Sequence, residues 1–301
     1  MGSKTRNFKI GAVYFIVRNF PSYLNSKLHH IHLVSLFRTS DIISIDQVLK
    51  PIMKDIKILE TDGINIGNKN IKGSIISLSF DNLGGNTLFN MVKSFNATYF
   101  CRICTSTSEE TKTMVNENPT NLRTANNYEG ICKKIKKERV DSYLGIKGKS
   151  ILNYSNYFYI FEAYTVDVMH DMLEGVVQRE IHFIIELIVK KKILTLDIIN
   201  TRIQEFNFGS IEMKNRPSPI VLKQSGLIGQ RAAQTWCLIR FLPLIISDVI
   251  QHPEIIEAWY VMTLLIEILQ IIFSPSITQG NIGHLKGLIE EHHSLVLSVF
   301  K

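Results

Sequence analysis

The sequence predicts a mixed fold, in which an α/β region is followed by a mainly helical region. Short runs of β-branched and aromatic residues bounded by turn residues occur in residues 8–80. From Val166 onward, apolar residues recur at helical spacing instead. Of the 301 residues, 45% are hydrophobic and 20% are charged, which excludes a disordered or collagen-like chain. The predicted fold class is therefore α/β plus α.

The N-terminal elements follow from residue type and spacing. Residues 8–17 (FKIGAVYFIV) predict a buried strand, because they are β-branched and aromatic. Residues 28–37 are apolar at mixed spacing, which leaves strand and helix open. Residues 46–60 have the apolar spacing of a helix, which the turn Thr61-Asp62-Gly63 ends.

Two further strands are expected at residues 64–66 and 71–80, the second running directly into Asp81. A carboxylate at a strand end can hold Mg²⁺ together with one or two other acids. An aspartate before Asn-Leu-Gly-Gly is also a common turn former, so both interpretations stay open. Helical spacing through Phe95 then leads to a Cys-x-x-Cys pair.

Cys101 and Cys104 form this pair, the most specific local motif of the chain. Two thiolates at this spacing on a turn can hold one edge of a zinc ion, but a structural site needs four ligands. The sequence offers no second such pair, so this is half a zinc site. A redox pair and two structural cysteines are the other interpretations. Four cysteines in all favour a reducing compartment.

Residues 105–150 are polar and then basic. The first part, 105–130, has few large apolar side chains and predicts a loop or insertion. The basic run that follows could track a phosphate backbone or form a solvated face, and consists of Lys133, Lys134, Lys136, Lys137 and Arg139. The next segment has tyrosines that could stack on bases or belong to the core, namely Tyr154, Tyr157, Tyr159 and Tyr164.

The C-terminal region predicts four helices, over residues 166–192, 230–250, 253–273 and 282 to the last residue, with a kink at Pro243. His170, Asp171 and Glu174 lie in the first turns of the first helix. Because His170 and Glu174 are four residues apart, they share a face and could bind a metal or each other. N-terminal helix acids with an intrahelical pair are the alternative, which we prefer.

The most hydrophobic window, residues 255–273, is long enough to span a bilayer. It carries Glu257 and Glu267, and an acid at mid-membrane costs about 2.5 kcal/mol or more. The first eight residues lack the apolar core of a signal peptide. We therefore expect no membrane partner and no secretion, and a nuclear or cytoplasmic location.

In their order along the chain, several motifs resemble eukaryotic cut-and-paste DNA transposases of the CACTA/Mirage/Chapaev group. A fainter likeness is to the Transib transposases and the V(D)J recombinase catalytic core. The motifs are Asp81-Asn82-Leu83-Gly84, Cys101-x-x-Cys104, Arg123-Thr124-x-x-Asn127-Tyr128, Val166-Asp167-x-Met169-His170-Asp171-x-Leu173-Glu174-Gly175 and Leu222–Pro243. The likeness covers nearly the whole chain.

The resemblance implies a partial RNase H-like core of the DDE type over residues 1–104, a polar and basic insertion over 105–150, and a mainly helical insertion region over 151–301. In that family three acids hold two Mg²⁺ ions, and two Cys and two His hold Zn²⁺. Asp81 matches the second acid, whereas Cys101 and Cys104 match the first half of the zinc site. The other acids and the His pair would lie beyond both ends, so we expect a truncated fragment without cleavage activity by itself and with weak zinc binding at best.

A non-catalytic DNA-binding or protein-interaction module made from the same fold is the alternative, with DNA, a second copy or a full-length transposase as partner. A nuclease completed by another subunit is a third hypothesis. The charge is polarised in a way that suits DNA. Residues 1–150 have 22 Lys and Arg against 12 Asp and Glu, a net charge of +10, whereas residues 151–301 have 12 against 15, a net charge of −3.

Overall fold

The computed structural model describes residues 9–25, 27–163 and 165–300. The chain folds into two compact units, each discontinuous in sequence, and contains both helices and small sheets, as the mixed class predicted. Unit 1 comprises residues 1–105 and 122–165, and unit 2 comprises residues 106–121 and 166–301. The expected linker, 105–150, is thus divided between the two units.

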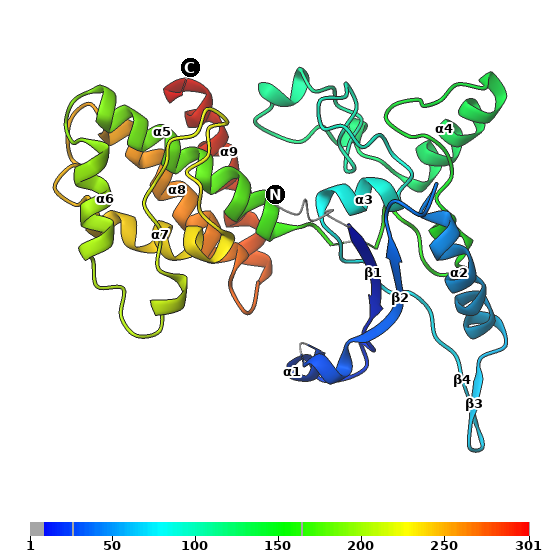
Figure 1. Cartoon of the computed structure of the whole chain (residues 1–301). Coiled ribbons are helices and arrows are strands. Elements are labelled where there is room, and N and C mark those ends of the chain that lie inside the picture. Colours follow the sequence, from blue (N-terminus) through cyan, green and yellow to red (C-terminus); the bar gives the residue numbers. More distant parts are fainter. Residues whose placement is uncertain (1–8, 26, 164, 301) are drawn as a thin grey trace, which may run out of the picture. The chain divides into compact units, whose positions relative to one another are not determined.

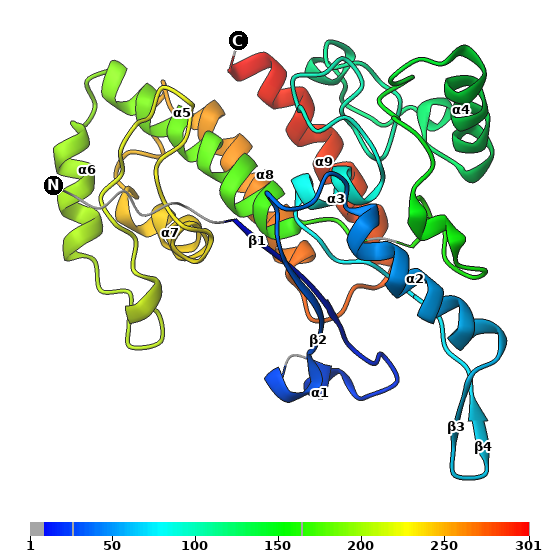
Figure 2. The same ribbon diagram turned by 45° about the vertical axis from the view of Figure 1, so that its right-hand side comes forward.

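The described part of unit 1 contains two separate two-stranded antiparallel sheets, β1 with β2 and β3 with β4 (Figure 1). The β3–β4 hairpin extends beyond the end of α2 in both views (Figures 1 and 2). The elements in chain order are β1 Ile10–Phe15, α1 Ser22–Asn25, a 3-10 turn Leu28–His30, β2 His32–Arg38, α2 Asp46–Thr61, β3 Ile64–Ile66, β4 Lys69–Ile71, α3 Asn82–Leu88, α4 Ala125–Glu138 and a 3-10 turn Ile151–Tyr154.

The first predicted strand forms, but it is not buried. Among the described strands, β1 pairs with β2 alone. Val13 of β1 packs against the core of unit 1. The outward side chains Ile10 and Tyr14 remain exposed. A two-stranded ribbon covers one face at most, which is why a run of apolar residues here does not imply burial. The ambiguous segment 28–37 resolves into the 3-10 turn and most of β2.

The strand predicted over residues 71–80 is wrong. β4 ends at Ile71. After it, the Gly73 N–H donates to the Leu59 carbonyl, and Leu78 exchanges backbone hydrogen bonds with Ala163 and Thr165. Ile75, Leu78 and Phe80 instead pack against the core of unit 1, whereas Ile76 is exposed. A run of apolar residues can thus pack against a core without a neighbouring strand.

The core of unit 1 lies beneath α2 and α4. Leu49 and Met53 are the buried apolar residues of α2, one turn apart. The other buried residues of this core come from α4 and from the segments around it, and are Phe89, Met91, Tyr128, Ile131, Ile135, Ile146, Leu152, Phe158 and Ile160. The two helices therefore each bury one face and leave the other to solvent.

Unit 2 is helical, and α5, α8 and α9 run side by side in both views (Figures 1 and 2). Its core includes a stripe of α5 at helical spacing, with Ile181, Ile184, Ile185 and Ile188 completely buried. Its elements are 3-10 turns Glu110–Lys112, Pro119–Asn121 and Met213–Asn215, a π-helix Met169–Val176, α5 Val177–Lys190, α6 Leu196–Glu205, α7 Ala232–Ile245, α8 Ile256–Ile272 and α9 Gln279–Val299.

Residues 106–121 belong to unit 2 because they contact α9. The Asn116 side-chain amide donates to Glu290 at 3.0 Å, and His293 Nδ1 lies 3.1 Å from the carbonyl oxygen of Val115. The described part of the chain contains no helix with the length and hydrophobicity needed to cross a membrane.

Candidate nucleic-acid interface

Helix α4 carries the basic run of the sequence, and a capping box fixes its start. The Thr124 hydroxyl accepts the Asn127 N–H at 3.3 Å, and the Asn127 side chain accepts the Thr124 N–H at 3.0 Å. The helix ends at Arg139, whose φ of 54° is left-handed. The loop predicted over 105–130 therefore extends too far, because the helix begins at Ala125.

The opposite face of α4 is a row of free cations. Tyr128, Ile131 and Ile135 are buried on one side of the helix, so the other side faces solvent. The exposed cations there are Lys133, Lys136, Lys137 and, just after the helix, Arg139. Their side chains form no hydrogen bond or ion pair with any other described residue. This set is called the α4 basic face below.

Lys134 is engaged within unit 1. Its Nζ lies 3.9 Å from the centre of the Tyr143 ring, a cation–π distance. A hydrogen bond with Tyr143 raises the pKa of Lys134 above its ordinary value. We therefore expect Lys134 to contribute less to binding than its three lysine neighbours.

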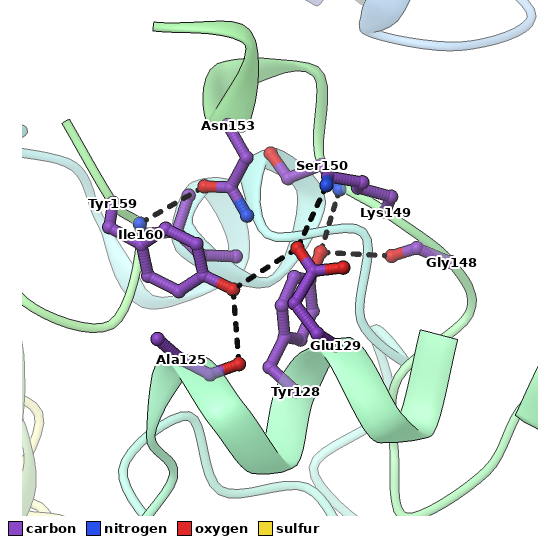
Figure 3. A network of polar contacts seen from close by, with 9 residues as sticks. All are labelled: Ala125, Tyr128, Glu129, Gly148, Lys149, Ser150, Asn153, Tyr159 and Ile160. Carbon is purple, nitrogen blue, oxygen red and sulfur yellow. Dashed lines mark hydrogen bonds and ion pairs between the residues drawn. The ribbon is translucent and has the colours of Figure 1, made fainter. Parts of the chain in front are cut away.

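Two tyrosine hydroxyls attach the first turns of α4 to the segment that follows it (Figure 3). Tyr128 Oη accepts the Ser150 N–H at 2.7 Å and donates to the Gly148 carbonyl at 3.2 Å. Tyr159 Oη donates to the Ala125 carbonyl at 3.3 Å. Burial raises the pKa of both tyrosines. The α4 basic face is thus presented by a helix that is anchored on its buried side.

The tyrosines singled out in the sequence fall into two groups. Tyr159 is half-buried and hydrogen-bonded in this network, whereas Tyr154 and Tyr157 are 68% and 74% exposed. Tyr164 lies outside the described residues. The exposed pair is therefore available for stacking, and Tyr159 is part of the packing around α4.

Asp81 is the N-cap of α3. Its Oδ1 accepts the Gly84 N–H at 2.5 Å, and it precedes the helix in an extended conformation. The carboxylate thus performs the turn-forming role, while Mg²⁺ binding stays a prediction. Arg102 lies against the same helix and donates to the Asn82 carbonyl at 2.8 Å and the Asn86 side chain at 3.0 Å.

Cys101 and Cys104 lie on a tight turn. Cys101 Sγ accepts the N–H groups of Ile103 at 3.3 Å and Cys104 at 3.4 Å, and burial raises the pKa of its thiol. The buried Arg123 holds the turn by donating to the Cys101 carbonyl at 3.0 Å. In the described part of the chain, no three His, Cys, Asp or Glu side chains gather as metal ligands. Zinc binding by the Cys101 and Cys104 thiols stays a prediction.

His170, Asp171 and Glu174 lie on the π-helix that precedes α5. His170 Nδ1 is 2.5 Å from Asp167 Oδ2, and its Nε2 is 4.0 Å from Glu174 Oε2. The histidine thus lies between Asp167, which precedes the helix, and Glu174, which is four residues further along it. Asp171 is exposed.

Helix α2 carries a second row of cations that the sequence analysis missed. Lys50, Lys54 and Lys57 are exposed and spaced four and three residues apart, so they share one face. Their spacing is visible in the sequence, but it is less dense than that of the lysines in α4. Only side-chain contacts show that Lys57 also reaches the loop after residue 153, where its Nζ donates to the Tyr154 carbonyl at 3.4 Å.

Two buried glutamates were also missed. Glu60, at the end of α2, accepts hydrogen bonds from the Ser74 hydroxyl at 2.5 Å, the Asn156 N–H at 2.8 Å and the Ser155 hydroxyl. Burial alone would raise its pKa, but these hydrogen bonds and the charge of Lys57 outweigh burial, and the pKa lies below its ordinary value.

The second buried glutamate is Glu180 of α5. Its Oε1 lies 2.9 Å from His292 Nε2 of α9, an ion-pair contact outside hydrogen-bond geometry, and both residues are buried. Its Oε2 has no hydrogen-bond partner among the described residues. Burial raises the pKa of Glu180, although His292 and His293 act in the opposite direction.

The difference in net charge between the two units is larger than that between the two halves of the sequence. Unit 1 has 21 Lys and Arg against 10 Asp and Glu, a net charge of +11, whereas unit 2 has 13 against 17, a net charge of −4.

Scans of the sequence against protein-family models and against curated proteins find no match.

Proposed function

We propose that this chain is a transposase-derived protein that binds double-stranded DNA through the α4 basic face. The α4 basic face itself carries the proposal, because its four exposed cations have no acidic partner among the described residues. The phosphate backbone is a dense array of negative charge, and each lysine that contacts it releases a counterion. Binding of this kind needs no base-specific contact.

The way in which α4 is held supports this role. The capping box fixes its first turn, and the hydrogen bonds of Tyr128 and Tyr159 fix its buried side. A helix anchored in this way presents its lysines without further ordering of the backbone, which lowers the entropic cost of binding. The net charge of +11 on unit 1 adds long-range attraction for DNA.

The transposase origin is proposed from the order of motifs in the sequence. A partial RNase H-like core and a nuclear location are parts of the same proposal. In it, Asp81 acts as the cap of α3, since its carboxylate accepts the Gly84 N–H.

The salt dependence of DNA affinity tests the α4 basic face. The variant combines Lys133→Gln, Lys136→Gln and Lys137→Gln, and binding to a short DNA duplex is measured by fluorescence anisotropy at several salt concentrations. Each lost phosphate contact reduces the magnitude of the slope of log affinity against log salt by about 0.9. For three lysines we therefore expect this magnitude to fall by about 2.7. Affinity at low salt should fall as well.

The matched control combines Lys190→Gln, Lys191→Gln and Lys192→Gln in unit 2. It removes the same charge from residues of which Lys190 and Lys191 already pair with Glu186 and Glu254. We expect the affinity of this control to stay close to that of the wild type. Equal losses in both variants, or binding that does not depend on salt, would contradict the proposal.

The role of Asp81 has a separate test, which uses Asp81→Asn. Asparagine is as good an N-cap as aspartate, so the fold of α3 should be kept. We expect no cleavage of DNA by either protein with Mg²⁺ or Mn²⁺. Cleavage by the wild type that Asp81→Asn abolishes would assign the carboxylate to metal chemistry.

A further inference from the structure

A second surface of unit 1 combines exposed tyrosines with lysines. Tyr154 and Tyr157 are 68% and 74% exposed, and they flank Ser155 and Asn156 on one short loop. Single exposed aromatic residues are common and need no explanation. Two on one loop beside a row of cations have the composition of surfaces that bind unpaired bases.

The loop is rigid, because its two ends are buried and its backbone is bonded internally. Leu152 and Phe158 are each 3% exposed and belong to the core of unit 1. Ser155 Oγ accepts the N–H groups of Tyr157 at 3.2 Å and Phe158 at 3.1 Å. The backbone that carries the two tyrosines is thus fixed, while their side chains lie outside the core.

Helix α2 holds the same loop from the other side. Glu60 accepts the Asn156 N–H and the Ser155 hydroxyl, and Lys57 donates to the Tyr154 carbonyl and to the Asn156 side chain. A buried carboxylate is costly unless donors surround it, so these contacts bind the loop firmly to the last turns of α2. Lys57 is thereby placed directly beside the tyrosine pair.

The lysine row of α2 continues away from this contact. Lys50 and Lys54 share the face of Lys57, and their side chains make no hydrogen bond or ion pair within the described ranges. From Lys50 to Lys57 the helix advances about 10 Å, at 1.5 Å per residue. The tyrosine loop thus lies at one end of a track of positive charge.

We infer that Lys50, Lys54 and Lys57, with Tyr154 and Tyr157, form a binding surface for single-stranded nucleic acid. The lysines contact phosphates, and the tyrosine rings stack on bases. Bases in a duplex already stack on one another, whereas unpaired bases are free to stack on aromatic side chains. This surface shares no residue with the α4 basic face, so it is a second function and does not depend on the first.

A comparison of two oligonucleotides of the same length tests the stacking. One is oligothymidylate, and the other is an abasic strand that keeps the phosphates and lacks the bases. We expect the intact protein to bind oligothymidylate more tightly. Tyr154→Ala and Tyr157→Ala should each weaken that binding roughly fivefold or more, from about 1 kcal/mol or more per stacked base, and should leave abasic binding unchanged.

Tyr23→Ala is the matched control, because Tyr23 is also 68% exposed and also has a lysine near its ring, Lys27. It should not change oligothymidylate binding. Phenylalanine at 154 and 157 should keep the affinity, since it keeps the ring. Lys50→Gln with Lys54→Gln should weaken binding of both strands and reduce the salt dependence.

Equal affinity for the two oligonucleotides would overturn the inference, as would an equal loss in Tyr23→Ala. The α4 triple variant separates this result from the proposed function. It should lower duplex affinity and leave the preference for oligothymidylate over the abasic strand intact. The two tests are therefore independent, and a negative result for one surface does not contradict the proposal for the other.

Discussion

The two units each bury a glutamate, and they hold the two carboxylates in opposite ways. Glu60 of unit 1 is 3% exposed and receives three hydrogen bonds, which place its pKa below the ordinary value. Glu180 of unit 2 is 5% exposed and lies against His292, with His293 nearby, and burial raises its pKa. Both side chains have little exposed surface, but Glu180 lies deeper than Glu60, so the depth of burial and the donors around each carboxylate together give the opposite shifts in pKa.

The surfaces of the two units also differ in whether their charged side chains have partners. In unit 2 many charges are paired, as in Lys190–Glu186, Lys191–Glu254, Arg202–Asp248 and Arg240–Glu212. In unit 1 the lysines on the outer faces of α2 and α4 are mostly left without acidic partners among the described residues. Surface pairs add little stability, about 0–1 kcal/mol each, so the difference matters more for binding than for folding.

The largest change is expected from His292→Ala, which removes the partner of Glu180 at the contact between α5 and α9. Truncation of this buried imidazole leaves a cavity between the two helices and removes the contact of the Glu180 carboxyl group, which together cost about 3 kcal/mol. Urea unfolding followed by tryptophan fluorescence measures it, because both tryptophans, Trp236 and Trp259, lie in unit 2.

The exposed His284 of the same helix provides the control. His284→Ala should unfold at nearly the same urea concentration as the wild type. If His292→Ala and His284→Ala were equally stable, the buried pair would have no part in holding α9 to α5.

The second largest change is expected from Glu60→Gln in unit 1. The amide cannot accept three hydrogen bonds as a carboxylate does, and hydrogen bonds to a charged group are worth about 2 kcal/mol. The loss should appear as faster hydrogen exchange at the end of α2 and in residues 152–158. Hydrogen exchange measured by mass spectrometry can locate this loss of stability, whereas tryptophan fluorescence cannot, because both tryptophans lie in unit 2.

The pH dependence of this effect has a definite sign. Since the folded pKa of Glu60 is lowered, its stabilisation is complete above the ordinary value of 4.5 and is lost as the pH falls through the folded pKa. The difference between wild type and Glu60→Gln should therefore shrink below about pH 4.5. Glu129→Gln removes a surface pair with Lys149 and should change exchange little at any pH.

A smaller effect is expected from Thr124→Ala at the start of α4. Loss of the N-cap hydroxyl costs about 1 kcal/mol and frees the first turn. Hydrogen exchange in residues 125–131 should accelerate, and duplex affinity should fall slightly because the α4 basic face is less ordered. The exposed Ser142→Ala serves for comparison, and an equal response there would argue against a specific role of the capping box.

The smallest net change is expected from Glu180→Gln, whose amide keeps the volume of the side chain and an oxygen toward His292. The raised pKa means that the folded state favours the protonated form, so wild type loses stability as the pH rises through the titration of Glu180. The variant should therefore gain stability relative to wild type as the pH rises, with His292 and His293 as the facing groups. A difference that does not change with pH would contradict the assigned direction.

Apolar periodicity predicted most of the helices. Residues 46–60 and the segments that became α5, α7 and α8 bury apolar residues at helical spacing, which can be recognised in the sequence. α9 was predicted in the same way, although its buried residues are Leu288 and His292. α6 was missed, although Ile199 and Ile203 are buried one turn apart and Thr195 caps the helix. Residues 71–80 were misread because an extended apolar segment that packs against a core has the same residue types as a strand.

The candidate sites were predictable only in part. The sequence located the α4 lysines, but it could not show that Lys134 lies over Tyr143 or that Thr124 caps the helix. The tyrosine loop depends on a contact between Glu60 and Ser155, which are 95 residues apart. A single sequence contains no signal for such a pair, because neither residue belongs to a local motif that would indicate its partner.

The discontinuity of the two units has a consequence for how the protein can be divided. The chain passes between them three times, after residues 105, 121 and 165. One proteolytic cut at any of these points leaves the units linked by the remaining crossings. A fragment ending at residue 165 would also carry residues 106–121 away from α9, the helix to which Asn116 and His293 attach them. Neither unit can be produced intact by shortening the chain from one end.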